Sequence, residues 1–189
     1  MVSLRHTRYV HPERDPSRRM LVPATRLRVV QVLTGGQTGA DRAATDFAVA
    51  SGIAYGGWVP SGGWAEDSPT PPGVLAAYPN FTATASEDPA VRTIRNVDDA
   101  DGLLVVSIGE FTSRGTELAL ARAAQRHTPL VSIDVRHRDA GRLLETFVTT
   151  LGVGCRLNVA GPRESEQPGA YGAVRRFLDA HADLLRGVR

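Results

Sequence analysis

The chain has 189 residues, of which 42% are hydrophobic, so it is long enough to bury the core of one globular domain. Its formal net charge of +2 gives little support for nucleic acid as a partner. All of its 22 basic residues are arginines, which excludes mechanisms that need a lysine, such as a Schiff base.

The sequence also lacks the marks of membrane, secreted and metal-binding proteins. No apolar run approaches the roughly 18 to 20 residues that span a bilayer, and no apolar stretch follows the first arginines as it would in a secretory signal. A single cysteine precludes an intramolecular disulfide, and the five histidines show no metal-ligand spacing. We therefore expect a cytoplasmic protein with no membrane partner and no metal.

Residues 1–26 are rich in arginine and proline and show little hydrophobic periodicity. This composition predicts a flexible leader, which leaves residues 27–189 as a single ligand-binding domain. A nucleic-acid-binding tail is the alternative interpretation of the arginines, and we consider it the less favoured one.

Strand and helix patterns alternate along the rest of the chain. A β-rich run over 27–33 is followed by a helix that Gly52 ends, with Thr38 and Asp41 spaced as in a capping box. Residues 56–73 form a long loop rich in glycine and proline, of the kind that serves as a lid or a binding loop. The later elements are an extended piece at 81–84, helices at 88–100, 115–126, 140–151 and 168–185, and strands at 103–107, 130–134 and 155–159.

This alternation predicts an α/β fold with a mainly parallel sheet that carries helices on both faces. In such sheets, the loops that follow the strands gather at one edge, and ligands bind there. Three polar loops, near residues 34–39, 111–117 and 160–164, follow predicted strands. We therefore expect them to converge.

The first of these loops is the strongest functional signal. Its glycines allow a close approach of backbone amides, and the helix behind it offers unpaired N–H groups to a phosphate or similar anion. A tight turn that needs glycine and binds nothing is the simpler alternative, but the polar side chains favour a ligand. The candidate ligand-binding residues of this loop are Thr34, Gly35, Gly36, Gln37, Thr38, Gly39, Asp41 and Arg42.

The second loop also opens a helix, and its arginine is suited to a phosphate. Its candidate residues are Ser113, Arg114, Gly115, Thr116 and Glu117. Two tryptophans in the 56–73 loop, Trp58 and Trp64, are candidates to stack on a planar ring, or they anchor the loop to the core. The secondary candidates are Trp58, Glu66, Asp67, Arg92, Asn96, Gly161 and Pro162.

The run Thr-Gly-Gly-Gln-Thr-Gly-Ala-Asp-Arg-Ala-Ala at 34–44 resembles the signature of the molybdenum-cofactor carrier family. That family is a circularly permuted branch of the SLOG superfamily, related to the LOG-type phosphoribohydrolases. The resemblance extends from about residue 29 to the C-terminus. Its further motifs are Gly-Trp-Val-Pro at 57–60, Ala-Glu-Asp at 65–67, Arg92-Thr93 with Asn96-Val97, the run 99–104 leading to Gly115-Thr116, and Leu-Asn-Val-Ala-Gly-Pro-Arg-Glu at 157–164.

The resemblance implies a Rossmann-like fold that is usually oligomeric, a dimer or a tetramer, and binds a phosphorylated or nucleotide-like ligand. In characterised carriers that ligand is the molybdenum cofactor, a phosphorylated pterin, or a molybdate-like oxyanion. The resemblance therefore favours a carrier of such a cargo. We expect the phosphate to bind to the backbone amides of residues 35–39 and to contact Arg114 of the second loop. We expect the planar ring of the ligand to lie against Trp58 or Trp64.

LOG-type enzymes cleave nucleoside monophosphates with a catalytic arginine and a glutamate in the motif Pro-Gly-Gly-x-Gly-Thr-x-x-Glu. Arg92 corresponds to that arginine, but residues 112–119 lack Pro-Gly-Gly, and Glu117 follows Thr116 directly. A shift of two helical residues rotates a side chain by about 200°, which makes hydrolysis the less expected activity. A nucleotide N-glycosidase using Arg92 and Glu117, or a sensor of a nucleotide derivative, stays as the alternative.

Overall fold

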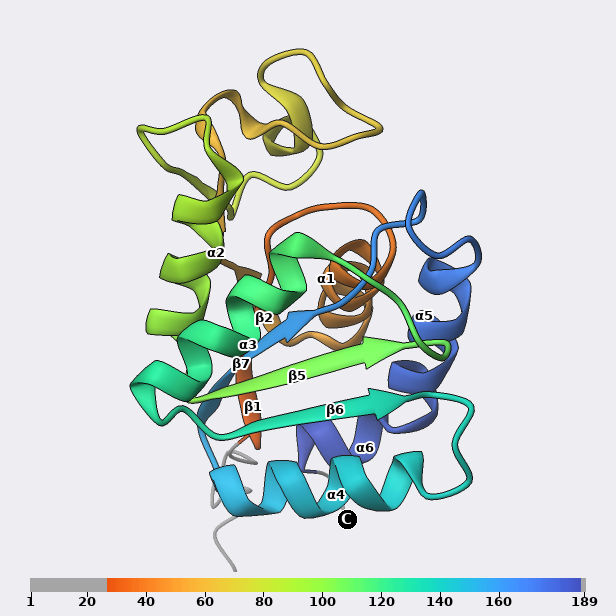
Figure 1. Ribbon diagram of the computed structural model, residues 1–189. Coiled ribbons are helices and arrows are strands. Elements are labelled where there is room, and N and C mark those ends of the chain that lie inside the picture. The colour runs from red at the N-terminus through yellow and green to blue at the C-terminus, as the bar shows by residue number, and fades with distance from the viewer. Residues whose placement is uncertain (1–26, 188–189) are drawn as a thin grey trace, which may run out of the picture.

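A five-stranded parallel sheet forms the centre of the protein (Figure 1). The computed structural model describes residues 27–187, so the predicted leader at 1–26 lies outside the described residues. All pairings in the sheet are parallel, and the strand order is β2-β1-β7-β5-β6. The strands are β1 (Val29–Leu33), β2 (Ala54–Gly56), β5 (Gly102–Ser107), β6 (Leu130–Asp134) and β7 (Cys155–Ala160).

Helices cover both faces of this sheet, as predicted. The fully buried strand β5 shows the two layers, because Leu104 and Val106 belong to one core cluster, whereas Leu103 and Val105 belong to the other. The first cluster packs against α1 (Ala40–Ser51), α4 (Ala140–Leu151), α5 (Ala170–Ala180) and α6 (Ala182–Arg186). The second packs against α2 (Pro89–Asp98) and α3 (Arg114–Arg126). The α/β, Rossmann-like fold class is thereby confirmed.

The strand order explains why three loops meet at one edge of the sheet. The connection from β1 through α1 to β2 runs outward in one direction, and that from β5 through α3 to β6 runs outward in the other. Right-handed crossovers then place α1 and α3 on opposite faces. Because β7 fills the space between β1 and β5, the loops after these three strands open side by side at the carboxyl edge.

Most helix boundaries follow the predicted signals. Asp88 caps α2 by accepting a hydrogen bond from the Ala90 amide at 2.9 Å, with Pro89 in the first position, and Gly52 ends α1 in the left-handed conformation. The predicted capping box of Thr38 and Asp41 is wrong, because Gly39 occupies the N-cap position and no side chain caps the helix. The predicted terminal helix divides at His181 into α5 and α6.

The long loop predicted at 56–73 is more ordered than expected. Strand β3 (Trp58–Val59) pairs in parallel with β4 (Thr82–Ala83), and two 3-10 turns, η1 (Ser61–Gly63) and η2 (Gly73–Ala76), lie between them. The segment has an apolar cluster of its own, formed by Val59, Ala65, Val74 and Phe81. It is therefore a small lobe beside α2 (Figure 1).

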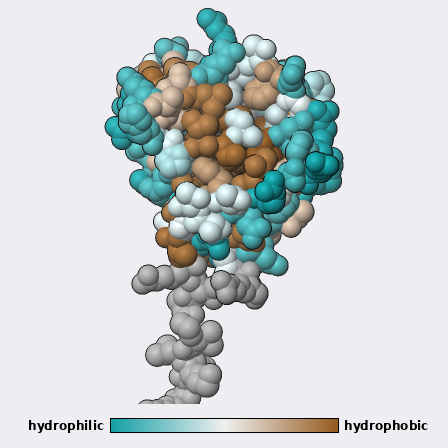
Figure 2. All heavy atoms as spheres, turned by 60° about the horizontal axis from the view of Figure 1, so that its bottom comes forward, coloured by the Kyte–Doolittle hydropathy of each residue, from teal (hydrophilic) through white to brown (hydrophobic). Residues whose placement is uncertain are grey.

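One face of the edge strand β6 is left open. Leu130 on β6 is 41% exposed and Leu143 on the neighbouring α4 is 37% exposed. Figure 2, which turns the α4 side toward the viewer, shows apolar side chains gathered into a continuous patch.

Among the described residues, no helix is both long enough and apolar enough to cross a membrane.

Candidate functional site

A small polar pocket lies where the three loops meet. It has a volume of about 30 Å³ and shares Arg92, Thr93, Gly115 and Arg163 with the wall of a wider groove of about 490 Å³. Its walls come from the loop after β1, helix α2, the start of α3 and the loop after β7. The lining residues are Gly35, Gln37, Asp41, Arg92, Thr93, Asn96, Ser113, Gly115, Thr116, Ala119, Asn158, Val159, Ala160, Gly161 and Arg163.

A buried arginine points from α2 into this pocket. The Arg92 side chain is only 11% exposed, and its guanidinium rests directly against the backbone of Gly35, so that a Cβ at that position would overlap it. Its Nη1 lies 3.8 Å from Oδ2 of Asp41, whereas its Nε has no hydrogen-bond partner in the described structure. Burial lowers the pKa of Arg92, and Asp41 offsets this effect only in part. A buried guanidinium whose Nε lacks a hydrogen-bond partner is expected to attract an anion.

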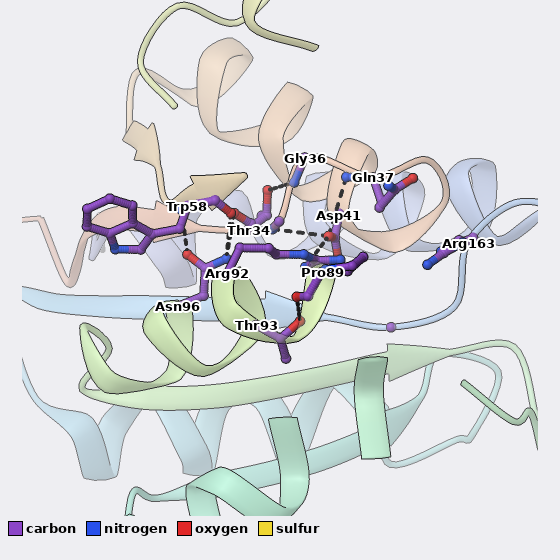
Figure 3. A network of polar contacts seen from close by, with 12 residues as sticks. Thr34, Gly36, Gln37, Asp41, Trp58, Pro89, Arg92, Thr93, Asn96 and Arg163 are labelled. Atoms are coloured by element: carbon purple, nitrogen blue, oxygen red, sulfur yellow. Dashed lines mark hydrogen bonds and ion pairs between the residues drawn. The ribbon is translucent and has the colours of Figure 1, made fainter. Parts of the chain in front are cut away.

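The Asp41 carboxylate accepts hydrogen bonds from backbone amides of the glycine-rich loop. Its Oδ2 accepts hydrogen bonds from the amides of Gly35 at 3.1 Å and Gln37 at 3.4 Å, and the Gly36 amide donates to Thr34 Oγ1 at 3.2 Å (Figure 3). Burial raises the pKa of Asp41, although Arg92 and the two amides act in the opposite direction. These three amides are thus engaged within the loop, so the expected cradle of loop amides around a phosphate stays a prediction.

Besides Arg92, positive charge at the pocket comes from the loop after β7 and from the start of α3. Arg163, after β7, lines both the pocket and the groove, and its guanidinium lies over the Trp64 ring, 5.6 Å from the ring centre. Arg114 is the first residue of α3 and lines the groove, while Gly115 and Thr116 in the first turn line the pocket. The N-terminus of a 13-residue helix adds a partial positive charge at this point.

Asn96 and Trp58 have an anchoring role. The Asn96 amide group donates to the carbonyl oxygens of Thr34 and Trp58, at 3.2 and 3.0 Å, and accepts from the Trp58 amide at 2.7 Å. The Trp58 indole points away from Arg92 (Figure 3), donates to Asp99 at 2.7 Å and is stacked by Arg95. These contacts favour the alternative that Trp58 anchors the loop, and its stacking on a bound ring stays a prediction.

Several other predicted residues lie outside the pocket. Arg42 forms a two-pronged ion pair with Asp67, at 2.9 and 3.1 Å, and both face a groove on the other side of α1. Glu66 accepts hydrogen bonds from Thr38 and from Ser165, which joins the small lobe to the loop after β7. Burial alone would raise the pKa of Glu66, but these hydrogen bonds outweigh it and lower the pKa.

The glutamate of the alternative, enzymatic hypothesis is separated from its arginine. Glu117 lines a cavity between α3 and β6, together with Phe111 and Asp134, and does not line the pocket that contains Arg92. Pro162 has a structural role as well, since its carbonyl accepts the Ala40 amide at the start of α1 at 3.0 Å.

The pocket also contains residues that were not among the predicted site residues, namely Thr93, Asn158 and Arg163. All three lie in motifs that carry the family resemblance, at 92–93 and 157–164, and this was the signal that could have identified them. Within residues 27–187, no group of three or more histidine, cysteine, aspartate or glutamate side chains is placed to hold a metal ion.

Fold and site together define an α/β protein with a small basic pocket at the carboxyl edge of a parallel sheet. A model of the circularly permutated YpsA SLOG family matches residues 32–182, and the chain belongs to this family, which confirms the resemblance noted in the sequence. A crystal structure from Syntrophus aciditrophicus SB, which carries the provisional name of a molybdenum carrier protein, is similar with a TM-score of 0.73 and 36% identity. The match covers 81% of this chain and 94% of that one. No curated protein gives a significant match.

Proposed function

We propose that this protein binds a phosphorylated small molecule and carries it as cargo. The observation that carries this proposal is the buried Arg92 guanidinium, whose Nε lacks a partner and which faces a pocket with Arg163 and the start of α3. A pocket of about 30 Å³ holds more than one water and suits a single tetrahedral phosphate. The wider groove, with Arg114 at its rim, has room for the rest of the ligand.

The cargo that we propose is the molybdenum cofactor, a phosphorylated pterin. The family membership and the name of the Syntrophus protein support this choice. Trp64, which is stacked with Arg163, remains the aromatic candidate for contact with the ring. We propose that residues 27–189 form one cytoplasmic carrier domain. Native mass spectrometry of protein purified from its own host should show a bound pterin, whereas a bound nucleotide would favour the sensor alternative.

We expect Arg92→Gln to lose at least about tenfold in affinity for inorganic phosphate, because a hydrogen bond to a charged group contributes about 1.5 to 3 kcal/mol. Isothermal titration calorimetry or phosphorus NMR would measure the change. Arg95→Gln is the matched control, since Arg95 lies on the same helix but stacks on Trp58 outside the pocket. Equal phosphate affinity in the two variants would contradict the proposed site.

We further propose that the protein forms a homo-oligomer through the apolar patch beside β6 and α4. We expect Leu130→Glu to dissociate the oligomer, because burying the unpaired glutamate in an interface would cost several kcal/mol. Light scattering after size-exclusion chromatography would give the mass. Val49→Glu is the control, because Val49 is 54% exposed on α1, away from β6. A wild-type protein that is monomeric at micromolar concentration would rule out this proposal.

A further inference from the structure

The two oxygens of the Asp41 carboxylate have different surroundings. Oδ2 holds the amides of Gly35 and Gln37, as described above, and lies 3.8 Å from Arg92. Oδ1 accepts no hydrogen bond from any described residue, and Asp41 is part of the pocket wall. A pocket that otherwise offers positive charge to an anion therefore also presents a carboxylate oxygen with free lone pairs.

This oxygen has a predictable effect on which anions fit. The charged groups that face Asp41 are Arg92 from α2 and Arg163 from the loop after β7. A fully ionised oxyanion between these arginines would place its own oxygen against Oδ1 with no hydrogen between them. A phosphate that carries one proton would instead donate a short, charge-assisted O–H···O hydrogen bond to Oδ1.

We propose that Asp41 makes the pocket select phosphate groups that carry a proton over tetrahedral anions that carry none. The chemical class selected is the phosphomonoester, whose second pKa of about 6 leaves a proton available near neutral pH. Sulfate and molybdate have no proton to donate at that pH. This inference rests on the proposed function, and it implies that the phosphate end of a cofactor enters the pocket, in preference to an oxidised metal end.

Methyl phosphate and methyl sulfate test this selection directly. The comparison is made at about pH 6, because burial raises the pKa of Asp41 and the test needs its carboxylate form. At this pH methyl sulfate is a monoanion without a proton, whereas much of the methyl phosphate is a monoanion of similar shape that carries one. We expect the wild-type protein to bind methyl phosphate at least about tenfold more tightly, as measured by calorimetry or ligand-observed NMR. In Asp41→Asn the difference should disappear, because the amide can donate to either anion.

Asp46→Asn is the matched control, since Asp46 lies on the same helix but accepts the Tyr78 and Tyr171 hydroxyls outside the pocket. It should keep the wild-type preference. Equal binding of the two anions by the wild type, with weaker binding in Arg92→Gln, would overturn the selection and leave the proposed function intact. If neither these anions nor inorganic phosphate binds, both the proposed function and this inference fail.

A titration of the wild type gives a second test if Asp41→Asn does not fold. Raising the pH through the second pKa of methyl phosphate removes the proton that Oδ1 accepts. We expect the affinity for methyl phosphate to fall over this range, while that for methyl sulfate changes less. Tighter binding of the methyl phosphate dianion would overturn the inference.

Discussion

Gly39→Ala is expected to destabilise the protein by about 3 kcal/mol, which lowers Tm by roughly 6 to 12 °C. Gly39 has φ 68° and ψ −126°, a conformation that side chains disfavour. A Cβ there would also overlap the carbonyl oxygen of Pro162 and approach the Glu164 nitrogen at 2.8 Å. Because these neighbours are backbone atoms of the loop after β7, they can move away only if this loop, which lines the pocket, moves as well. Thermal unfolding followed by circular dichroism would measure the loss.

Gly52→Ala is a close control for this substitution. Gly52 stands at the other end of the same helix with φ 67°, but no atom lies within 4 Å of the position of its Cβ. This variant should lose only about 1 kcal/mol, from backbone strain alone. If the two variants unfold at the same temperature, the contact between Gly39 and the loop after β7 does not contribute to stability.

Asn96→Ala is expected to cost about 3 to 5 kcal/mol of unfolding free energy. Asn96 is 2% exposed, and its side chain makes all three of the hydrogen bonds to Thr34 and Trp58 described above. Alanine would leave those backbone groups without their partner and loosen α2 from β1 and β3. Since Arg92 lies one turn earlier on α2, phosphate affinity should fall as well. Urea unfolding, together with phosphate titration, would measure both effects.

Asn80→Ala supplies the comparison, because Asn80 is an exposed turn residue whose side chain makes no hydrogen bond to a described residue. Its stability should stay within about 0.5 kcal/mol of the wild type. A loss in Asn96→Ala that is as small as this would mean that water replaces the lost hydrogen bonds, and Asn96 would then not be the anchor described here.

The fold could be predicted largely because its signals are local. The apolar run of β5, the Asp88-Pro89 start of α2 and the Gly52 stop of α1 each depend on a few adjacent residues. The extended piece predicted at 81–84 contains β4, but the order within 56–73 escaped prediction, because β3 is only two residues long and pairs with β4 across more than twenty residues. No periodicity can be read from such short strands.

The candidate site was predictable only in part, because its geometry depends on the direction in which each side chain points from its loop. Arg42 and Asp41 are adjacent in sequence, yet Asp41 turns into the pocket, whereas Arg42 turns to Asp67 on the other side of α1. The use of the loop amides by Asp41, and the arrival of Arg163 from a loop about 120 residues away, are both tertiary effects. No spacing within one motif encodes them.

The central position of β7 has a consequence for the order of events during synthesis. β7 is the last strand to be made, yet it lies between β1 and β5. Until it emerges from the ribosome, β2-β1 and β5-β6 are two separate strand pairs with open edges, and sheet closure must wait for contacts between residues far apart in sequence. Gly161 and Arg163 follow β7, so a growing chain has no complete pocket. Binding of the proposed ligand is therefore expected only after β7 and the loop that follows it have been made.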